Sequence, residues 1–352
     1  MGKIRVLVVD DSAFMRKVIS DMIKNDADLE LIGTARNGKD ALVKLVELKP
    51  DVITLDVEMP EMNGLEALEK IMAINPTPTI MLSSLTEKGA DITIKALAKG
   101  AVDFVQKPGG SISLNLHEVE KEIIAKIKLA YQVNIKNLIS QKSEEEKPHL
   151  GNFEYEKILN CQLEFPLILI GTSTGGPKAL SKVIENLNNT IKAPILIVQH
   201  MPGGFTKSLA QRLNSLTNLI VKEGENGELI KVGHVYIAPG NFQMEVKMDK
   251  TCQLYLHIHQ GPLITGHRPS VDALFNSVAN LGIGGIIAVI MTGMGYDGRE
   301  GLINLKKQGA FTIAESEETC VVYGMPKAAV EAGCIDQVVP LDKIHEAIMK
   351  SL

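Results

Sequence analysis

The chain has 352 residues, and its 45% hydrophobic and 22% charged content is that of an ordinary globular protein. This length exceeds what one hydrophobic core usually holds, so we expect two domains. The net charge of −5, without a basic stripe, argues against nucleic-acid binding.

The first part of the chain alternates strand and helix patterns. Short apolar runs that predict strands are Ile4–Val9, Leu29–Ala35, Val52–Leu55, Thr79–Leu82 and Val102–Val105. Segments with helical periodicity are Ala13–Asn25, Gly38–Leu48, Gly64–Asn75, Lys88–Lys99 and a last one from Leu114 onward. Five successive strand–helix units predict a doubly wound α/β domain over residues 1–130, with a parallel sheet and helices on both of its faces.

The middle of the chain predicts a linker over residues 131–160. Its charged run Ser143–Glu146 is followed by Lys147 and Pro148, which is typical of a solvated segment. From Phe165 onward the alternation resumes, so we expect a second, larger α/β domain over residues 161–352.

The second half also contains runs with a period of two. They are Val235–Ala238, Gln243–Met248 and Leu254–His259, and they predict an antiparallel excursion from the main sheet. His257 and His259 alternate on one face of the last run. Two histidines could hold a metal ion, but the sequence shows no third ligand in range.

Polar residues stand at the carboxyl ends of the first set of strands. Asp10 and Asp11 follow the first strand, Asp56 the third, Ser83 the fourth and Lys107 the fifth. Alone, each has an ordinary explanation, such as a helix cap, a loop or a turn. Together they predict three carboxylates, one hydroxyl and one ammonium at one rim, where Mg²⁺ and a phosphoryl group could be held.

These residues lie in motifs that resemble the receiver domain of two-component response regulators. The matching stretches are Val8–Ser12, Asp56–Glu66, Met81–Ser84 and Val105–Pro108. The resemblance implies that a histidine kinase phosphorylates Asp56. It implies Mg²⁺ held by Asp10, Asp11, Asp56 and the backbone carbonyl of Glu58, with Ser83, Phe104 and Lys107 as switch residues.

Three apolar runs of the second half end at residues that a hydrolase could use. Leu167–Ile170 leads to Ser173, Ile195–Val198 leads to His200, and Ile286–Met291 leads to Asp297. Runs of this kind predict buried parallel strands, whose carboxyl ends meet at one rim. A Ser–His–Asp catalytic triad is therefore the leading hypothesis, with Ser173 in a Gly-x-Ser-x-Gly turn.

Each of the three residues also has a simpler explanation. Ser173 could cap a helix or belong to a glycine-rich loop that holds phosphate. His200 alone could be structural, and Asp297 alone could cap the helix that begins near Gly298. The chain order Ser, His, Asp differs from that of α/β-hydrolases, so we do not expect that fold.

The second half resembles the catalytic domain of the CheB family of chemotaxis protein-glutamate methylesterases. The matching stretches are Ile170–Pro177, Val198–Pro202, Val235–Gly240, His267–Asp272, Met291–Gly298 and Val321–Pro326. The resemblance implies that Ser173 is the nucleophile, His200 the general base and Asp297 the residue that orients it. Backbone amides near Thr174 and at Met294 would form the oxyanion hole, and His267 and Arg268 would line the cleft.

The expected function is that of a phosphorylation-activated esterase acting on methylated glutamates of chemoreceptors, which releases methanol. Deamidation of receptor glutamines by the same chemistry is a further expectation. Mg²⁺ is expected for receiver phosphorylation and no cofactor for the esterase reaction. The alternatives are a response regulator whose glycine-rich loop binds a nucleotide or another ligand, and an adaptor without enzymatic activity.

The sequence shows no pattern of a membrane span, a signal peptide or a cysteine metal site. The longest apolar stretch, around Ile283–Met294, is too short to cross a bilayer, and no signal-peptide pattern is seen. Four cysteines (Cys161, Cys252, Cys320 and Cys334) form no metal-binding pattern, and we expect them to be reduced. We therefore expect a cytoplasmic protein without direct membrane insertion.

Overall fold

The protein is described by a computed structural model that covers residues 2–84, 86–107, 116–133, 165–187 and 191–352. The chain divides into two compact units, residues 1–140 and 141–352. The linker expected at 131–160 lies outside the described residues, apart from 131–133. Within the described part of the chain, no helix is both long and apolar enough to span a membrane.

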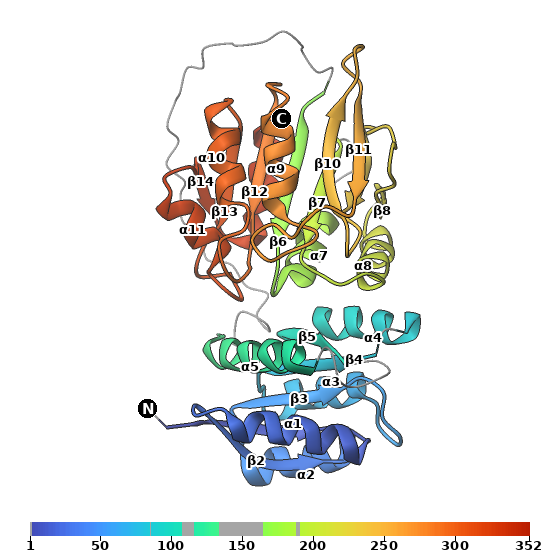
Figure 1. Ribbon diagram of the computed structural model, residues 1–352, viewed down its shortest axis with the longest axis vertical. Coiled ribbons are helices and arrows are strands. Elements are labelled where there is room, and N and C mark those ends of the chain that lie inside the picture. Colours follow the sequence, from blue (N-terminus) through green and yellow to red (C-terminus); the bar gives the residue numbers. More distant parts are fainter. Residues whose placement is uncertain (1, 85, 108–115, 134–164, 188–190) are drawn as a thin grey trace. The chain divides into compact units, whose positions relative to one another are not determined.

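The first unit is built on a five-stranded parallel sheet with strand order β2-β1-β3-β4-β5. Its elements are β1 (Ile4–Val9), α1 (Ala13–Asn25), β2 (Leu29–Ala35), α2 (Gly38–Leu48), β3 (Val52–Asp56), α3 (Gly64–Ile74), β4 (Thr79–Ser83), α4 (Glu87–Ala98), β5 (Asp103–Gln106) and α5 (Leu116–Gln132). Every predicted element is present, and each boundary that differs within the described residues moves by one residue. The predicted helix start at Leu114 lies outside the described residues. The doubly wound fold predicted for this half is confirmed (Figure 1).

Local sequence explains where these helices begin. Ser12, Asn37, Asn63 and Thr86 each precede a helix, and each side chain accepts a hydrogen bond from a backbone N–H of the first turn. Glu66 completes a reciprocal capping box with Asn63. The strand order reverses between β1 and β3, and in such sheets ligands bind outside the strand ends at that point.

The second unit is built on a seven-stranded sheet with strand order β14-β13-β12-β6-β7-β9-β8. Its strands are β6 (Leu167–Thr172), β7 (Ile195–Gln199), β8 (Ile220–Glu223), β9 (His234–Ile237), β12 (Ile286–Ile290), β13 (Phe311–Glu315) and β14 (Gln337–Val339). All pairings in this sheet are parallel. The central strands β6, β7 and β12 are buried on both faces, which explains their unbroken apolar runs.

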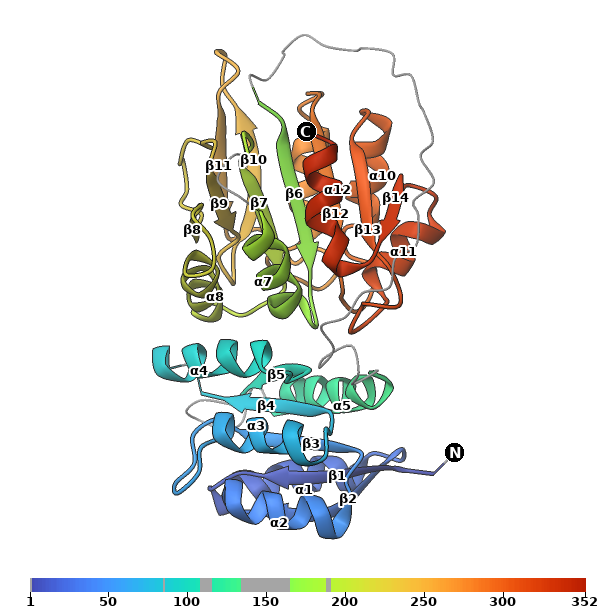
Figure 2. The same cartoon turned by 180° about the vertical axis from the view of Figure 1, so that it is seen from behind.

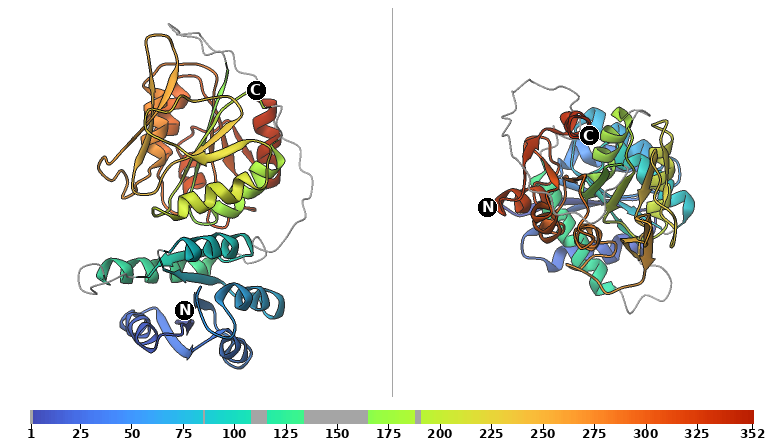
Figure 3. Two further views of the ribbon diagram at one scale, coloured as in Figure 1. Left: turned by 90° about the vertical axis from the view of Figure 1, so that its right-hand side faces the viewer. Right: turned by 90° about the horizontal axis from the view of Figure 1, so that it is seen from above.

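Helices cover both faces of the seven-stranded sheet. They are α7 (Gly176–Asn186), α8 (Phe205–Asn214), α9 (Val271–Ala279), α10 (Arg299–Lys307), α11 (Met325–Glu331), the short 3₁₀ helix η1 (Leu341–Lys343) and α12 (Ile344–Lys350). Figure 2 shows α7 and α12 in front of the sheet, and Figure 3 shows α12 (red) and the orange helices α9 and α10 on opposite sides of it. A doubly wound second domain is confirmed.

A separate antiparallel hairpin is formed by β10 (Gln243–Met248) and β11 (Leu254–His259). It confirms the predicted antiparallel excursion, but the prediction was wrong for Val235–Ala238. The corresponding strand β9 pairs parallel with β7 and β8 in the main sheet. A period of two shows that a strand has two different faces but carries no information on the direction of its neighbours.

The expectation of four reduced cysteines was wrong for Cys252, which forms a disulfide. Cys320 and Cys334 are reduced and buried. Sequence spacing does not reveal which cysteines the fold brings within bonding distance.

Candidate active site and phosphoacceptor site

Ser173 and His200 follow two neighbouring strands at the same level. Thr172, the last residue of β6, pairs with Gln199, the last residue of β7. The backbone N–H of His200 donates to the carbonyl of Thr172 at 3.1 Å. The sheet therefore brings the predicted serine and histidine to adjacent positions, next to the point between β6 and β12 where the strand order reverses.

The turn after Ser173 depends on glycines. Gly175 has a φ of +80°, a backbone conformation that residues with a Cβ rarely adopt. A Cβ on Gly176 would lie 2.0 Å from Oε1 of Gln199. The first residue of α7 must therefore be glycine for the helix to begin this close to Gln199. These glycines keep Ser173 at the tip of a sharp strand–helix turn.

His200 and Asp297 meet across the carboxyl end of the sheet. Nε2 of His200 lies 2.7 Å from Oδ2 of Asp297, and both side chains are buried. Nδ1 of His200 is also buried and has no hydrogen-bond partner among the described residues. The ring nitrogen that is left unpaired is therefore Nδ1, not Nε2.

Asp297 is held as a carboxylate by donors from one segment. The hydroxyl of Ser270 donates to Oδ1 at 2.8 Å, and the backbone N–H groups of Val271 and Asp272 donate at 2.7 and 3.2 Å. Burial alone would raise the pKa of Asp297, but the hydrogen bond and charge of His200, together with these donors, hold it below its usual range. The neighbouring Asp272 has a pKa raised to about 6, mainly by burial.

His267 lies flat against His200. The ring centroids are 3.8 Å apart and the planes differ by 10°. Burial, followed by the charge of His200, lowers the pKa of His267 to about 4, so the ring is neutral at pH 7. Arg268 donates from its guanidinium to the carbonyl of Gly261 at 2.8 Å. No hydrogen bond between Arg268 and Ser173 is found among the described residues.

Thr174 and Met294 lie in the two loops that flank Ser173. Thr174 is buried, and its carbonyl accepts a hydrogen bond from the hydroxyl of Thr292 at 2.9 Å. A Cβ on Gly293 would lie 2.8 Å from the Cβ of Ser173, which shows how closely the loop that carries Met294 approaches. The Met294 side chain itself is exposed.

The first unit gathers the residues predicted for a phosphoacceptor site. Nζ of Lys107 lies 2.7 Å from Oδ2 of Asp10 and 2.7 Å from Oδ2 of Asp56. Ligand oxygens of Asp10, Asp11 and Asp56 all lie within 4.8 Å of one another. Burial raises the pKa of Asp56 to about 6, although Lys107 opposes this shift.

This carboxylate set fits Mg²⁺, because hard oxygen ligands at one rim are what this ion prefers. The backbone N–H of Glu58 donates to Asp56 at 3.2 Å, which brings the backbone of Glu58 next to the three carboxylates. Ser83 is buried and accepts a hydrogen bond from the hydroxyl of Thr93 at 2.8 Å. Phe104 is buried, and Nζ of Lys126 lies 5.4 Å from its ring centroid.

Comparisons with known proteins identify a family for each of the two units. The family model described as CheB methylesterase matches residues 168–348, and the model described as response regulator receiver domain matches residues 6–117. The chain belongs to the CheB methylesterase family. Its relatives in this family include a protein-glutamate methylesterase/protein-glutamine glutaminase of Halalkalibacterium halodurans, 50% identical over 99% of this chain and 98% of that protein.

Further CheB relatives support this assignment along the whole chain. A protein of the same name from Thermotoga maritima is 47% identical over 99% of this chain and 98% of that protein. The crystal structure of the Thermotoga maritima CheB methylesterase catalytic domain is 45% identical, covers 54% of this chain and 100% of that chain, and has a TM-score of 0.53. The family assignment from the motifs is therefore confirmed.

Sequence reasoning missed the residues that surround the CheB site. Gln199 is buried and links three groups, since its Nε2 donates to the carbonyls of Ser173 (2.9 Å) and His200 (3.1 Å), and its Oε1 accepts from Thr172 (2.5 Å). Glu315, at the end of β13, accepts from the backbone N–H of Thr292 at 2.9 Å. Gln199 belongs to the matching stretch Val198–Pro202, so the sequence contained a signal for it. Glu315 lies in none of the matching stretches, and only the position of β13 beside β12 brings it to the candidate site.

Proposed function

We propose that this chain hydrolyses γ-glutamyl methyl esters on the cytoplasmic signalling domains of chemoreceptors and releases methanol. The observation that carries this proposal is the hydrogen bond between His200 and Asp297 beside Ser173. The names of the relatives supply the bond that is cleaved, a methyl ester of a protein glutamate. The resemblance to chemotaxis methylesterases supplies the receptor as the protein that carries it. Such substrates are cytoplasmic, so the enzyme acts in the cytoplasm.

The reaction uses Ser173 as nucleophile. Its Oγ attacks the ester carbonyl while the proton passes to His200, and Asp297 stabilises the imidazolium that forms. Since Nε2 is bonded to Asp297, Nδ1 is the nitrogen that takes the proton. His200 then returns this proton to the departing methoxide, and methanol leaves.

The acyl-enzyme is hydrolysed by the reverse use of the same groups. His200 takes a proton from water, the resulting hydroxide attacks the acyl carbon, and Ser173 regains its proton as the glutamate carboxylate leaves. Backbone amides near Thr174 and at Met294 hold the oxyanion in both steps, each worth about 3 kcal/mol. His267 and Arg268 line the cleft.

Deamidation follows from the same chemistry. A receptor glutamine offers an amide carbonyl to Ser173, and His200 delivers its proton to nitrogen, so that ammonia leaves instead of methanol. The glutaminase activity in the names of the relatives supports this second reaction.

Control by phosphorylation is proposed for the first unit. Asp56 accepts a phosphoryl group from the chemotaxis histidine kinase, and Lys107 pairs with the phosphoryl oxygens. Mg²⁺, bound by Asp10, Asp11, Asp56 and the Glu58 carbonyl, would neutralise charge on the transferring group. Ser83 and Phe104 then change position, and this switch stimulates the esterase.

The experiment is a measurement of methanol release from methylated receptor membranes, with and without a small-molecule phosphodonor and Mg²⁺. We expect release that the phosphodonor increases and that Ser173→Ala abolishes without loss of phosphorylation. Ser181→Ala is the matched control, because among the described residues the hydroxyl of this α7 serine donates to the carbonyl of Pro177, away from the proposed triad. Near-normal turnover by Ser173→Ala would exclude the proposed nucleophile.

A further inference from the structure

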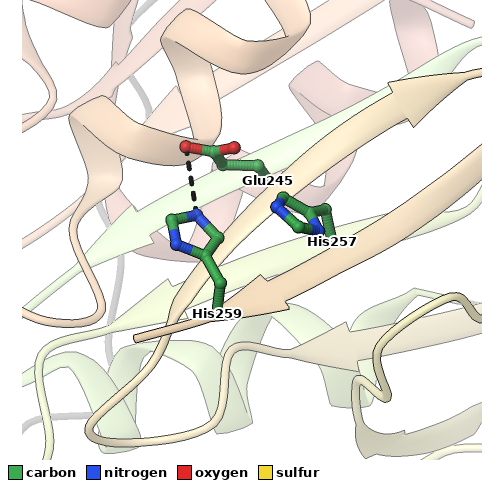
Figure 4. Close-up of side chains that lie close together, drawn as sticks. All are labelled: Glu245, His257 and His259. Carbon is green, nitrogen blue, oxygen red and sulfur yellow. Dashed lines mark ion pairs between the residues drawn. The ribbon is translucent and has the colours of Figure 1, made fainter. Parts of the chain in front are cut away.

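Three side chains with metal-binding groups share one face of the β10–β11 hairpin. Glu245 on β10 pairs directly with His257 on β11, and His259 lies two residues further along the same strand. Residues two apart on a strand point to the same face, so all three side chains lie together. Figure 4 shows the Glu245 carboxylate beside both imidazole rings.

The distances within this cluster suit a single ion. One ligand atom from each of Glu245, His257 and His259 lies within 4.8 Å of the others. Nε2 of His259 is 3.3 Å from Oε1 of Glu245. Two ligands of a tetrahedral Zn²⁺ ion, at bond lengths of 2.0–2.1 Å, are about 3.3 Å apart, so this pair already has the required spacing.

The cluster also contains an unsatisfied group. Nε2 of His259 is buried and forms no hydrogen bond among the described residues, although Glu245 is close. The rings of His257 and His259 are stacked with centroids 4.7 Å apart.

We propose that Glu245, His257 and His259 bind one divalent transition-metal ion, such as Zn²⁺, with a water molecule as the fourth ligand. Two imidazoles and one carboxylate form a known zinc ligand set with an open position. The Glu245 carboxylate supplies the negative charge that offsets the nearby Lys247. None of these three residues belongs to the proposed catalytic set or to the acidic cluster of the first unit.

The hairpin face connects this site to the loop that carries His267. Gln243 pairs with His259 across the hairpin and is buried. Its side-chain amide donates to the carbonyl of His267 at 3.1 Å and accepts from the backbone N–H of Ser270 at 2.9 Å. A metal ion on His259 would therefore bind next to the segment that holds Asp297.

The test is a calorimetric titration of the untagged full chain with Zn²⁺ in excess Mg²⁺, which occupies the acidic cluster. Co²⁺ absorption gives a second readout, since a tetrahedral site with nitrogen ligands has strong visible bands. We expect one high-affinity equivalent that His257→Ala, His259→Ala and Glu245→Gln each weaken by at least about 100-fold. Glu245→Gln preserves the shape of the side chain, and thermal melting verifies that each variant is folded.

His117→Ala is the matched control. His117 lies 3.6 Å from Glu120 in a histidine–glutamate pair for which the described residues offer no third ligand. This variant should bind Zn²⁺ like the parent chain. His267→Ala checks the stacked pair at the active site and should also leave the binding intact. The absence of saturable Zn²⁺ binding, or binding that His267→Ala removes and Glu245→Gln does not, overturns the proposal.

Discussion

Asp297 is bonded to Nε2 of His200, and Nδ1 of the same ring has no partner among the described residues. In the proposed mechanism the imidazole therefore carries its proton on Nε2, and the lone pair of Nδ1 serves as the base for Ser173. This is the opposite use of the two nitrogens from that in the serine proteases, where the aspartate holds Nδ1. A triad depends on roles, so either nitrogen can serve as the base.

Replacement of Asp297 tests this arrangement. In Asp297→Asn the side-chain amide can donate to Nε2, which favours the tautomer with its proton on Nδ1, and the base is then blocked. We expect kcat to fall by about 10³- to 10⁴-fold while substrate binding is kept. Ser270→Ala removes one of the donors to Asp297 and should cost far less. Equal losses in the two variants would contradict the tautomer argument.

Asp56→Asn should separate basal from stimulated activity. The amide cannot accept a phosphoryl group, so we expect methanol release to lose its response to phosphodonor and Mg²⁺ but to keep its basal rate. Asp21→Asn, an exposed carboxylate of α1 paired with Lys17, should respond like the parent chain. Stimulation that survives Asp56→Asn would rule out this residue as the phosphoacceptor.

Glu315 should make stability depend on pH. This carboxyl is fully buried and receives hydrogen bonds from Thr292 and Thr319, and burial raises its pKa to about 7 from 4.5. Because the folded state holds the proton more tightly than the unfolded state, the stabilisation is complete below about pH 4.5 and is lost as the pH rises through about 7. The difference is on the order of 3 kcal/mol.

Urea unfolding at about pH 5 and about pH 8 measures this effect. Glu315→Gln removes the titration, so the free energy of unfolding of this variant should change less between the two pH values than that of the parent chain. Glu318→Gln, an exposed glutamate nearby, should leave the pH dependence unaltered. An identical pH dependence in Glu315→Gln and the parent chain would show that Glu315 is already ionised in the folded protein.

Gln199→Leu should impair catalysis only by displacing Ser173 and His200, since Gln199 takes no part in the proposed chemistry. The change leaves the hydroxyl of Thr172 and the carbonyls of Ser173 and His200 without this partner, at about 1–3 kcal/mol for each buried group. We expect a loss of stability and a fall in kcat of about 10- to 100-fold, because both catalytic side chains are displaced. Gln211→Leu, on the exposed side of α8, is the control, and comparable activity in both variants would contradict a positioning role.

Much of this fold could be predicted from apolar runs and their terminating residues. Parallel strands buried on both faces leave a clear signal, and polar residues at their ends indicate where chemistry gathers. The resemblance to CheB proteins then connected Ser173, His200 and Asp297 with specific roles. The stacking of His267 on His200 agrees with its expected position in the cleft, although its role stays a prediction.

The remaining features depend on contacts that no local pattern encodes. Strand β9 has the alternation of an antiparallel strand, but its partners β7 and β8 determine its direction. Glu315 acts on the active-site loop only because β13 lies beside β12. Glu245 completes the histidine cluster through hairpin pairing, which the spacing of His257 and His259 could not reveal.

The three reactive groups of the second unit come from three adjoining strands, and the contact between His200 and Asp297 joins residues 97 positions apart. No short segment of the chain contains all three residues. Turnover should therefore vanish in step with cooperative melting of β6, β7 and β12. Partly unfolded molecules would then lack the proposed triad and should hydrolyse no ester.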